Sequence, residues 1–257
     1  MLAIVSKAFA NPPEELNSPS SHGSKKLPKL PDETLKLFLG RHPDDALSMS
    51  FGVAAVLASA RSSRHPLPLK DQRLFCGYDE IFCLFAGSLN NLCSLNKQYG
   101  LTKASNEAMF MIEAYRTLRD RGPYPADQVV KDLEGSFGFV IYDSIKGTVF
   151  VALGSDDGVN LYWGIGGDGS VVISDDLDVV KTGCAKSYAP FPKGFMFHSE
   201  GGLLSYEHPL QKVRPIKRVD SEGVMCGAYF RVDKYSRINS IPRRGSESNW
   251  MEWDPRD

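Results

Sequence analysis

The chain has 257 residues, a length that suits one large domain or two small ones. Hydrophobic residues make up 42% and charged residues 24%, which argues against a disordered or fibrous chain. With 30 Lys and Arg against 31 Asp and Glu, the formal net charge is -1. Proteins that bind nucleic acid regardless of its sequence usually carry a basic excess, so no nucleic-acid partner is expected.

The longest apolar runs, 53–60 and 81–86, are much shorter than the roughly 20 residues of a membrane helix. The first seven residues also lack the basic lead and long apolar segment of a secretory signal. We therefore expect no membrane span and a cytoplasmic location, with the nucleus as a second possibility. The five cysteines form no CxxC pair, so we expect free thiols, no metal site and no cofactor.

The first third of the chain mixes a proline-rich segment with a helix and strands. Five prolines within 11–31 predict a long surface loop. Asp32 is expected to cap a short helix over 33–39. Apolar and branched residues bounded by turn formers predict buried strands at 49–58 and 80–86.

The middle of the chain predicts two helices and the remainder predicts hairpins. Apolar residues recur on one face over 106–119, with Ser105 placed to cap that helix, and a second helix is predicted over 125–133. The period then changes to two, and glycine-containing turns separate successive strands. This order predicts an α+β protein with antiparallel sheets and a polar tail after residue 235. The expected hairpins pair 137–143 with 148–153, 161–165 with 171–174, and 195–198 with 203–206.

Two isolated signals favour ordinary structure over a ligand site. The glycines of 164–169 favour a hairpin turn over a phosphate loop, because no helical pattern follows them. The aspartates at 156, 157, 175, 176 and 178 lack the ligand spacing of a calcium loop, which favours a solvated loop.

The order of the segments is more informative than any isolated motif. The stretch 82–91, the helix starting at 104–107 and the strand 133–143 resemble the glutaminase domain of asparagine synthetases. The pair Tyr99-Gly100-Leu101 and Leu118-Arg119-Asp120-Arg121 resembles, more closely, the plant aluminium-induced or stem-specific proteins named for YGL and LRDR motifs. The first resemblance extends to about residue 209 and therefore concerns the architecture.

The resemblance implies an N-terminal-nucleophile hydrolase fold, a four-layer αββα sandwich with residues 1–10 as an early strand of an inner sheet. It implies one such domain over 1–234 and a polar tail over 235–257. In active relatives an N-terminal cysteine attacks the glutamine amide while the free α-amine handles protons. Here that position is Leu2, which has no nucleophile and is expected to block removal of the initiator methionine.

Further family positions have changed in the same direction. Ala86 and Gly87 stand where the family's oxyanion hole has an asparagine and a glycine, so only a backbone donor is expected to remain. Ser88 and Asn106 replace two acidic residues, and the arginine that holds the substrate carboxylate falls near Gly52. The resemblance therefore implies a retained fold without the reaction.

A residual pocket is expected where the family binds its substrate. Without acidic groups it is expected to accept a small uncharged or weakly anionic ligand. The residues expected at this pocket are Ala86, Gly87, Ser88, Asn90, Asn91, Ser105 and Asn106.

These changes favour a catalytically inactive binding or regulatory protein, and the resemblance to the plant aluminium-induced proteins implies a stress- or metal-responsive role. One alternative is an amide hydrolase with a non-standard nucleophile, for which Ser6 and Cys83 are the reactive residues near the expected site. The other is a purely structural homodimer. A homodimer is expected in any case, because the hydrolase relatives often associate. The tail sequence Arg243-Arg244-Gly245-Ser246 has the form of a phosphorylation site at Ser246, and Trp250 and Trp253 are expected to dock on the body or a partner.

Overall fold

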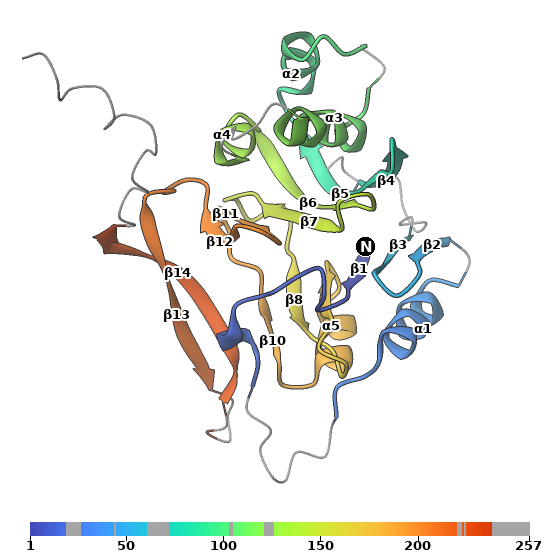
Figure 1. The fold of residues 1–257 in the computed structure, drawn as a ribbon, viewed down its shortest axis with the longest axis vertical. Coiled ribbons are helices and arrows are strands. Elements are labelled where there is room, and N and C mark those ends of the chain that lie inside the picture. The colour runs from blue at the N-terminus through green and yellow to red at the C-terminus, as the bar shows by residue number, and fades with distance from the viewer. Residues whose placement is uncertain are drawn as a thin grey trace, which may run out of the picture.

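The computed structural model describes residues 1–18, 27–43, 45–60, 72–102, 105–120, 126–219, 223 and 225–237. Two six-stranded antiparallel sheets and a separate two-stranded ribbon form the framework (Figure 1). The α+β class and the antiparallel sheets are thereby confirmed.

The first sheet has the strand order β10-β8-β9-β1-β3-β2, so the N-terminal strand lies inside it. Strand β1 pairs with β9 on one side and with β3 on the other, which confirms the expectation of an early inner strand. Its strands are β1 (Leu2–Val5), β2 (Ala46–Phe51), β3 (Ala55–Ala60), β8 (Tyr162–Ile165), β9 (Val171–Ser174) and β10 (Tyr188–Pro190).

The second sheet has the order β12-β11-β7-β6-β5-β4, and the ribbon pairs β13 with β14. The hairpins predicted from residue 137 onward are all present. The strands of the second sheet are β4 (Arg73–Tyr78), β5 (Ile81–Leu89), β6 (Gly135–Asp143), β7 (Thr148–Leu153), β11 (Phe195–His198) and β12 (Gly202–Ser205). The ribbon consists of β13 (Gln211–Val219) and β14 (Met225–Arg237).

Three apolar cores give the molecule four layers, because each sheet buries both of its faces. The largest core lies between the two sheets and contains Leu84, Val140 and Trp163. A second core lies between the second sheet and the helices α2 (Leu92–Gln98), α3 (Glu107–Asp120) and α4 (Ala126–Lys131). A third joins the first sheet to α1 (Pro31–Arg41) and α5 (Leu177–Cys184). None of the described helices is long and apolar enough to cross a membrane.

Two predicted elements of the N-terminal region differ in the structure. The single strand predicted over 49–58 is instead a hairpin of β2 and β3, with Gly52 at a φ of +60° in its turn. Helix α1 begins at Pro31, so Asp32 lies in its first turn and does not cap it. The Glu33 carboxylate instead accepts the Leu30 N–H at 3.1 Å.

The proline-rich segment is more ordered than a surface loop where the structure describes it. A 3-10 turn, η1 (Glu14–Leu16), buries the Leu16 side chain completely in the core between the sheets. The sequence analysis also missed β4, β10, α5 and the ribbon, whose second strand continues past residue 234. Residues 19–26, Pro125 and the tail from 238 onward, including Ser246, Trp250 and Trp253, lie outside the described residues.

Candidate functional site

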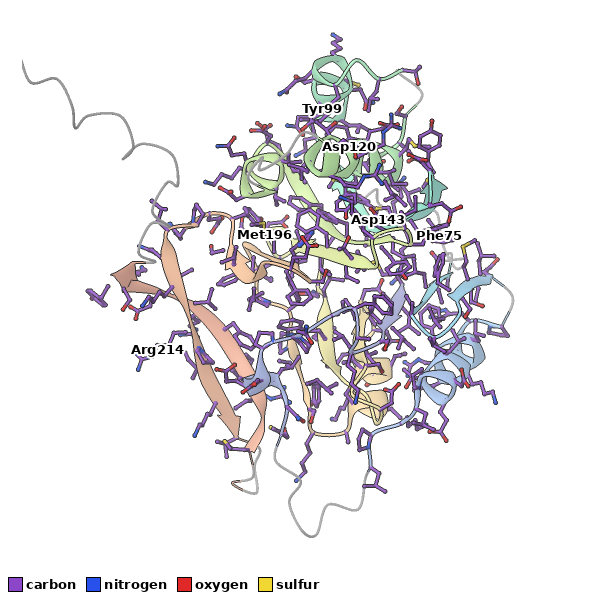
Figure 2. The ribbon with its side chains drawn as sticks, viewed as in Figure 1. Phe75, Tyr99, Asp120, Asp143, Met196 and Arg214 are labelled. Atoms are coloured by element: carbon purple, nitrogen blue, oxygen red, sulfur yellow. The ribbon has the colours of Figure 1, made fainter. Side chains whose placement is uncertain are left out.

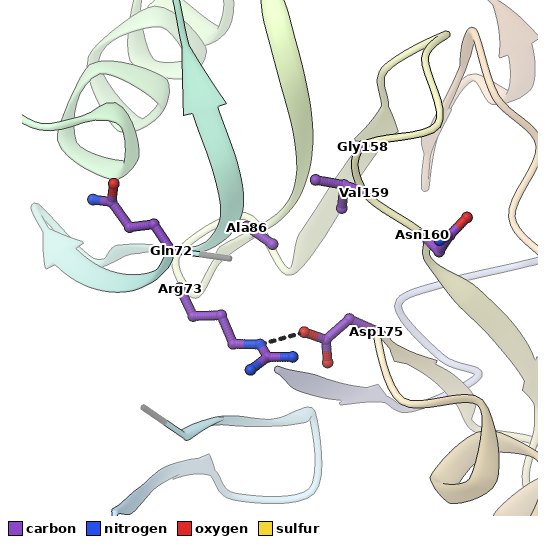
Figure 3. A pocket seen from close by; sticks show the side chains of 7 residues that line it. All are labelled: Gln72, Arg73, Ala86, Gly158, Val159, Asn160 and Asp175. Carbon is purple, nitrogen blue, oxygen red and sulfur yellow. Dashed lines mark hydrogen bonds and ion pairs between the residues drawn. The ribbon is translucent and has the colours of Figure 1, made fainter. Parts of the chain in front are cut away.

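A cavity of about 170 Å³ lies between the two sheets, next to the N-terminal strand. Arg73 at the start of β4 and Asp175 just after β9 face one another across it, while Ala86 contributes an apolar wall (Figure 3). The other lining residues are Gln72, Gly158, Val159 and Asn160. The cavity therefore joins segments from both sheets.

Asp175 is the central charge of this cavity. Its Oδ2 accepts from Nε of Arg73 at 2.5 Å, and its Oδ1 accepts from the amino group of Met1 at 2.5 Å. Burial opposes ionisation of the carboxyl, but the positive charges of the Met1 amine and Arg73 outweigh it and hold the pKa of Asp175 below its ordinary value. The carboxylate is therefore ionised at neutral pH and joins β1, β4 and β9.

The first two side chains of the chain point to opposite faces of the first sheet, as alternation along a strand requires. Met1 packs in the core between the sheets, whereas Leu2 packs against the helices α1 and α5. Leu2 is 0% exposed and pairs with Ala58 and Ser174 in the flanking strands. The position that the resemblance assigns to the nucleophile is thus a core position on the helix side.

Arg73 and the Met1 amine face the single carboxylate of Asp175. Burial lowers the pKa of that amine below its ordinary value of 8.0, although Asp175 opposes the shift, so Arg73 supplies the lasting positive charge of the cavity. Nε of Arg73 is occupied by Asp175, and the two Nη groups have no partner among the described residues. Such groups can donate two parallel hydrogen bonds to a carboxylate or phosphate. Chemically, the arrangement suits a small anion bound by Arg73.

The residues predicted at the pocket separate into two groups, and Ala86 is the member that lines this cavity. The N–H of Gly87 donates to the Gln72 carbonyl at 2.9 Å, so the donor expected to remain in an oxyanion hole is engaged by the backbone. Ser88 pairs with Ser136 in the register of β5 and β6. The N–H of Asn90 donates to the carbonyl of Glu134 at 2.7 Å, on the loop before β6.

Asn91, Ser105 and Asn106 support the helices that cover the second sheet. The Asn91 amide donates to the Asp132 carbonyl at 2.7 Å and accepts the Glu134 N–H at 3.2 Å, which fixes the end of α4. Asn106 caps α3, because its Oδ1 accepts the Met109 N–H at 2.8 Å. The carbonyl of Ser105, which was expected to cap this helix, accepts from Nδ2 of Asn96 at 3.2 Å.

A second and larger cavity of about 390 Å³ lies at the start of α1 and does not contain Ala86. It includes Gly52, near which the family's substrate arginine was aligned, and Ser6, the serine weighed as a nucleophile. The other candidate nucleophile, Cys83, is 0% exposed in the core beneath α3. Burial raises the pKa of its thiol well above the ordinary value, which makes it unreactive at neutral pH.

The aspartates weighed as a cation site have separate structural partners. Asp156 accepts the hydroxyl of Ser136, Asp157 pairs with Lys193, and Asp176 caps α5 by accepting the N–H of Asp178 at 2.9 Å. In the described part of the chain no three His, Cys, Asp or Glu side chains are grouped to hold a metal ion.

The YGL motif joins α2 to α3. Tyr99 lies edge-on to Phe110 at 5.1 Å, Gly100 adopts a φ of +69° just after α2, and Leu101 packs against the core beneath the helices. The glycine allows the left-handed turn that returns the chain to the sheet.

The LRDR motif holds α3 against the second sheet. Nη1 of Arg119 donates to the fully buried Asp143 at 3.3 Å, and its Nε donates to Asp120 at 2.8 Å. Hydrogen bonding to Asp120 and Asp143 raises the pKa of Arg119 above its ordinary value. Figure 2 shows Asp120 on α3 and Asp143 below it at the end of β6. This geometry supports a structural role for the motif, because Arg119 is occupied within the fold.

Sequence reasoning missed Arg73 and treated Asp175 as one of several loop aspartates. The two residues lie 102 positions apart, and no local pattern relates them. An arginine followed by a short run of apolar residues was the available signal, and β4 itself was not predicted.

Comparison with known proteins gives a consistent assignment. The model of a family described as "Aluminium induced protein" matches residues 2–232. The stem-specific protein TSJT1 of Nicotiana tabacum is 39% identical over 152 residues, which cover 59% of this chain and 99% of that protein.

Two solved structures that match part of this chain have titles that name a glutamine amidotransferase and a glutamine aminotransferase class-II domain protein. A glutamine phosphoribosylpyrophosphate amidotransferase from B. subtilis is 13% identical with a TM-score of 0.46, and the match covers 79% of this chain. This chain spans 47% of that enzyme, about half its length. A class-II glutamine aminotransferase domain protein from Silicibacter pomeroyi is 12% identical with a TM-score of 0.37, over 73% of this chain and 77% of that protein. These likenesses concern the fold, whereas the family match and the tobacco relative show that the chain belongs to the aluminium-induced protein family.

Proposed function

We propose that this chain is a catalytically inactive, amidotransferase-like protein that binds a small anionic ligand in the cavity between its sheets. The observation that carries the proposal is the placement of the first strand. Leu2 is buried on the helix side of the first sheet, while Arg73 and Asp175 form an ion pair that lines the cavity. The Leu2 side chain has no group that can attack an amide. In keeping with the family's name, we place the protein in a stress- or metal-responsive regulatory role in plants.

The absence of glutaminase activity can be tested directly. Purified protein is expected to release no ammonia from glutamine above the rate of a heat-denatured sample. An asparagine synthetase assayed in parallel provides the positive control. Turnover that survives repurification would contradict the proposal and favour the alternative of a hydrolase with a non-standard nucleophile. Replacing Ser6 or Cys83 by alanine would then identify that nucleophile, since these were the reactive candidates.

Ligand binding is tested separately, because an inactive protein need not bind anything. Calorimetry with glutarate as the probe is expected to give one site, and Arg73→Gln is expected to weaken it at least about tenfold by removing the charged donors. Arg41→Gln removes an arginine from an exposed ion pair with Asp176 and Asp178 and is the matched control. If the unaltered protein takes up no glutarate, or both variants bind alike, the cavity is not an anion site.

We also propose that the protein is a homodimer. Strand β2 offers an edge for association, because none of its six residues is charged and Leu47 and Met49 are 57% and 38% exposed. Unprotected edges of this kind readily pair with another chain. Light scattering is expected to give twice the chain mass of 28.4 kDa, and Met49→Lys is expected to lower it to the monomer value. A mass of 28.4 kDa for the unaltered protein at micromolar concentration would contradict the dimer.

A further inference from the structure

The ribbon of β13 and β14 stands at the edge of the molecule, beside the two sheets (Figure 1). Its inner face packs against the core between the sheets through Val213, Ala228, Phe230 and Val232. Its outer face carries the cross-strand pairs Arg214–Arg231 and Ile216–Tyr229, and all four of these residues are exposed. Packing against the core therefore accounts for the residues of the inner face of the ribbon, but not for those of its outer face.

The ribbon concentrates positive charge in a chain that is nearly neutral. Its two strands contain seven Lys and Arg and one Asp, and the sequence between them adds Asp220 and Glu222, so residues 211–237 have a formal charge of +4, whereas the whole chain has -1. The rest of the chain is therefore acidic by about the same amount. The basic residues are Lys212, Arg214, Lys217, Arg218, Arg231, Lys234 and Arg237.

One rung of the ribbon places two positive charges directly opposite each other. Arg214 pairs in register with Arg231, and neither forms an ion pair within 4 Å with another described residue. Asp233, the one carboxylate of the two strands, accepts from Tyr235 N–H at 3.0 Å and from the Ser236 hydroxyl at 2.8 Å. These hydrogen bonds lower the pKa of Asp233 and the charge of Arg214 contributes to the shift, so this carboxylate offsets part of the charge of the rung. Like charges directly opposite in a sheet are destabilising, and a bound anion between them removes that cost. Figure 2 shows Arg214 pointing away from the body of the molecule.

The next rung is apolar. Ile216 and Tyr229 lie opposite each other and are 41% and 43% exposed. Beyond them, the Arg218 guanidinium lies 4.1 Å from the ring centre of Tyr188 and 6.0 Å from that of Tyr229. A row of arginines next to an exposed aliphatic and aromatic pair matches the boundary of an anionic bilayer, where cations meet headgroups and apolar side chains enter below them.

We propose that the outer face of the β13–β14 ribbon docks on an anionic phospholipid surface. Arg214, Arg231 and Lys212 contact the negatively charged headgroups, and Ile216 and Tyr229 enter the interface between them. The protein then lies on the membrane without spanning it. A single-stranded RNA would meet the same charges, and its bases would stack on an aromatic ring such as that of Tyr229. The exposed Ile216 adds nothing to RNA binding, whereas it does add to binding at a bilayer interface.

Flotation with vesicles tests the charge contribution. The protein is expected to bind phosphatidylcholine vesicles that contain phosphatidylserine, and not vesicles of phosphatidylcholine alone. Each basic group near such a surface contributes about 1 kcal/mol, so Arg214→Gln with Arg231→Gln should weaken binding about thirtyfold. Lys36→Gln with Lys97→Gln makes the same change in net charge on the exposed surfaces of α1 and α2 and should leave binding within about twofold. Equal losses in both double variants, or no binding to either vesicle, would overturn the proposal.

A second variant separates the membrane from other polyanions. Ile216→Ser keeps every charge, so it should weaken vesicle binding about fivefold if the side chain enters the bilayer interface. It should leave the anisotropy of a fluorescent single-stranded RNA unchanged. Tighter binding to RNA than to vesicles, or vesicle binding that ignores Ile216→Ser, would assign the face to another polyanion. A variant enters these comparisons only if its urea unfolding midpoint equals that of the unaltered protein, which shows that it is folded to the same extent.

Discussion

Replacing Asp175 by asparagine should destabilise the protein more than any exposed carboxylate does. The Asp175 side chain is 10% exposed and binds the amine of Met1, whose side chain is 1% exposed, and the Arg73 side chain, which is 30% exposed. Asparagine keeps the size of the side chain but removes the counter-charge of Arg73 and of the Met1 amine, whose pKa burial already lowers. Removing one member of a buried ion pair costs roughly 3–5 kcal/mol, and the partial exposure of Arg73 places this site near about 3 kcal/mol.

Urea unfolding followed by circular dichroism at pH 7 measures this loss. The control is Asp178→Asn, since Asp178 pairs with Arg41 at 3.2 Å but is 66% exposed. Exposed pairs contribute about 0–1 kcal/mol, so the control should change the free energy of unfolding by less than about 1 kcal/mol. Equal losses in the two variants would refute the reasoning, because they would mean that the cavity is as well solvated as the surface.

The same pair sets a pH dependence with a definite sign. The folded pKa of Asp175 lies below its ordinary value of 3.8, so the folded state binds the proton less readily than the unfolded state. Its stabilisation is therefore complete above the ordinary value and is lost as the pH falls through the folded pKa. The difference in unfolding free energy between the unaltered protein and Asp175→Asn should shrink below about pH 4. A difference that stays constant to lower pH would contradict the assignment of the charge.

Three further outcomes follow from the contacts of α3 and from the thiols. Arg119→Met should cost about 3 kcal/mol because it leaves a buried carboxylate without its cation. Arg116→Met, which breaks a partly exposed pair with Glu113 on the same helix, should cost under about 1 kcal/mol in the same urea titration. Asn106→Ala should lower the unfolding free energy by about 1 kcal/mol and Asn106→Asp should not, because aspartate keeps the cap; equal losses would argue against capping. Iodoacetamide followed by peptide mass spectrometry should label the exposed Cys93 in the native protein and Cys83 only after unfolding.

The elements that the sequence predicted best are those whose own periodicity decides them. Helix α3 and the hairpins from residue 137 onward carry a clear apolar repeat and turn residues, and the structure contains each of them. The hairpin of β2 and β3 was read as one strand because its turn, around Gly52, is short and apolar residues continue on both sides. Local pattern could not show where one strand ended and the next began.

The cavity could not have been found from local pattern, because its charged members come from separate parts of the chain. Arg73 belongs to an edge strand of the second sheet, while Asp175 follows an inner strand of the first. The resemblance grouped Ala86 with Asn91 and Asn106. Ala86 lines the cavity, whereas the short polar side chains of Asn91 and Asn106 satisfy helix ends and loops. Such residues serve structure and ligand binding equally well, so sequence alone does not separate the two uses.

Gly87 illustrates why a retained family residue need not imply a retained reaction. Its φ is +100°, and a Cβ at this position would lie 2.0 Å from the Ser136 carbonyl oxygen, so the backbone requires glycine whatever the cavity does. Its N–H is already bound to the Gln72 carbonyl. The second sheet therefore requires this glycine whether or not the cavity supports a reaction, whereas Leu2, Ala86 and Ser88 have no positive φ that demands a particular residue. The presence of Gly87 is thus compatible with the proposal that the chain has the fold without the chemistry.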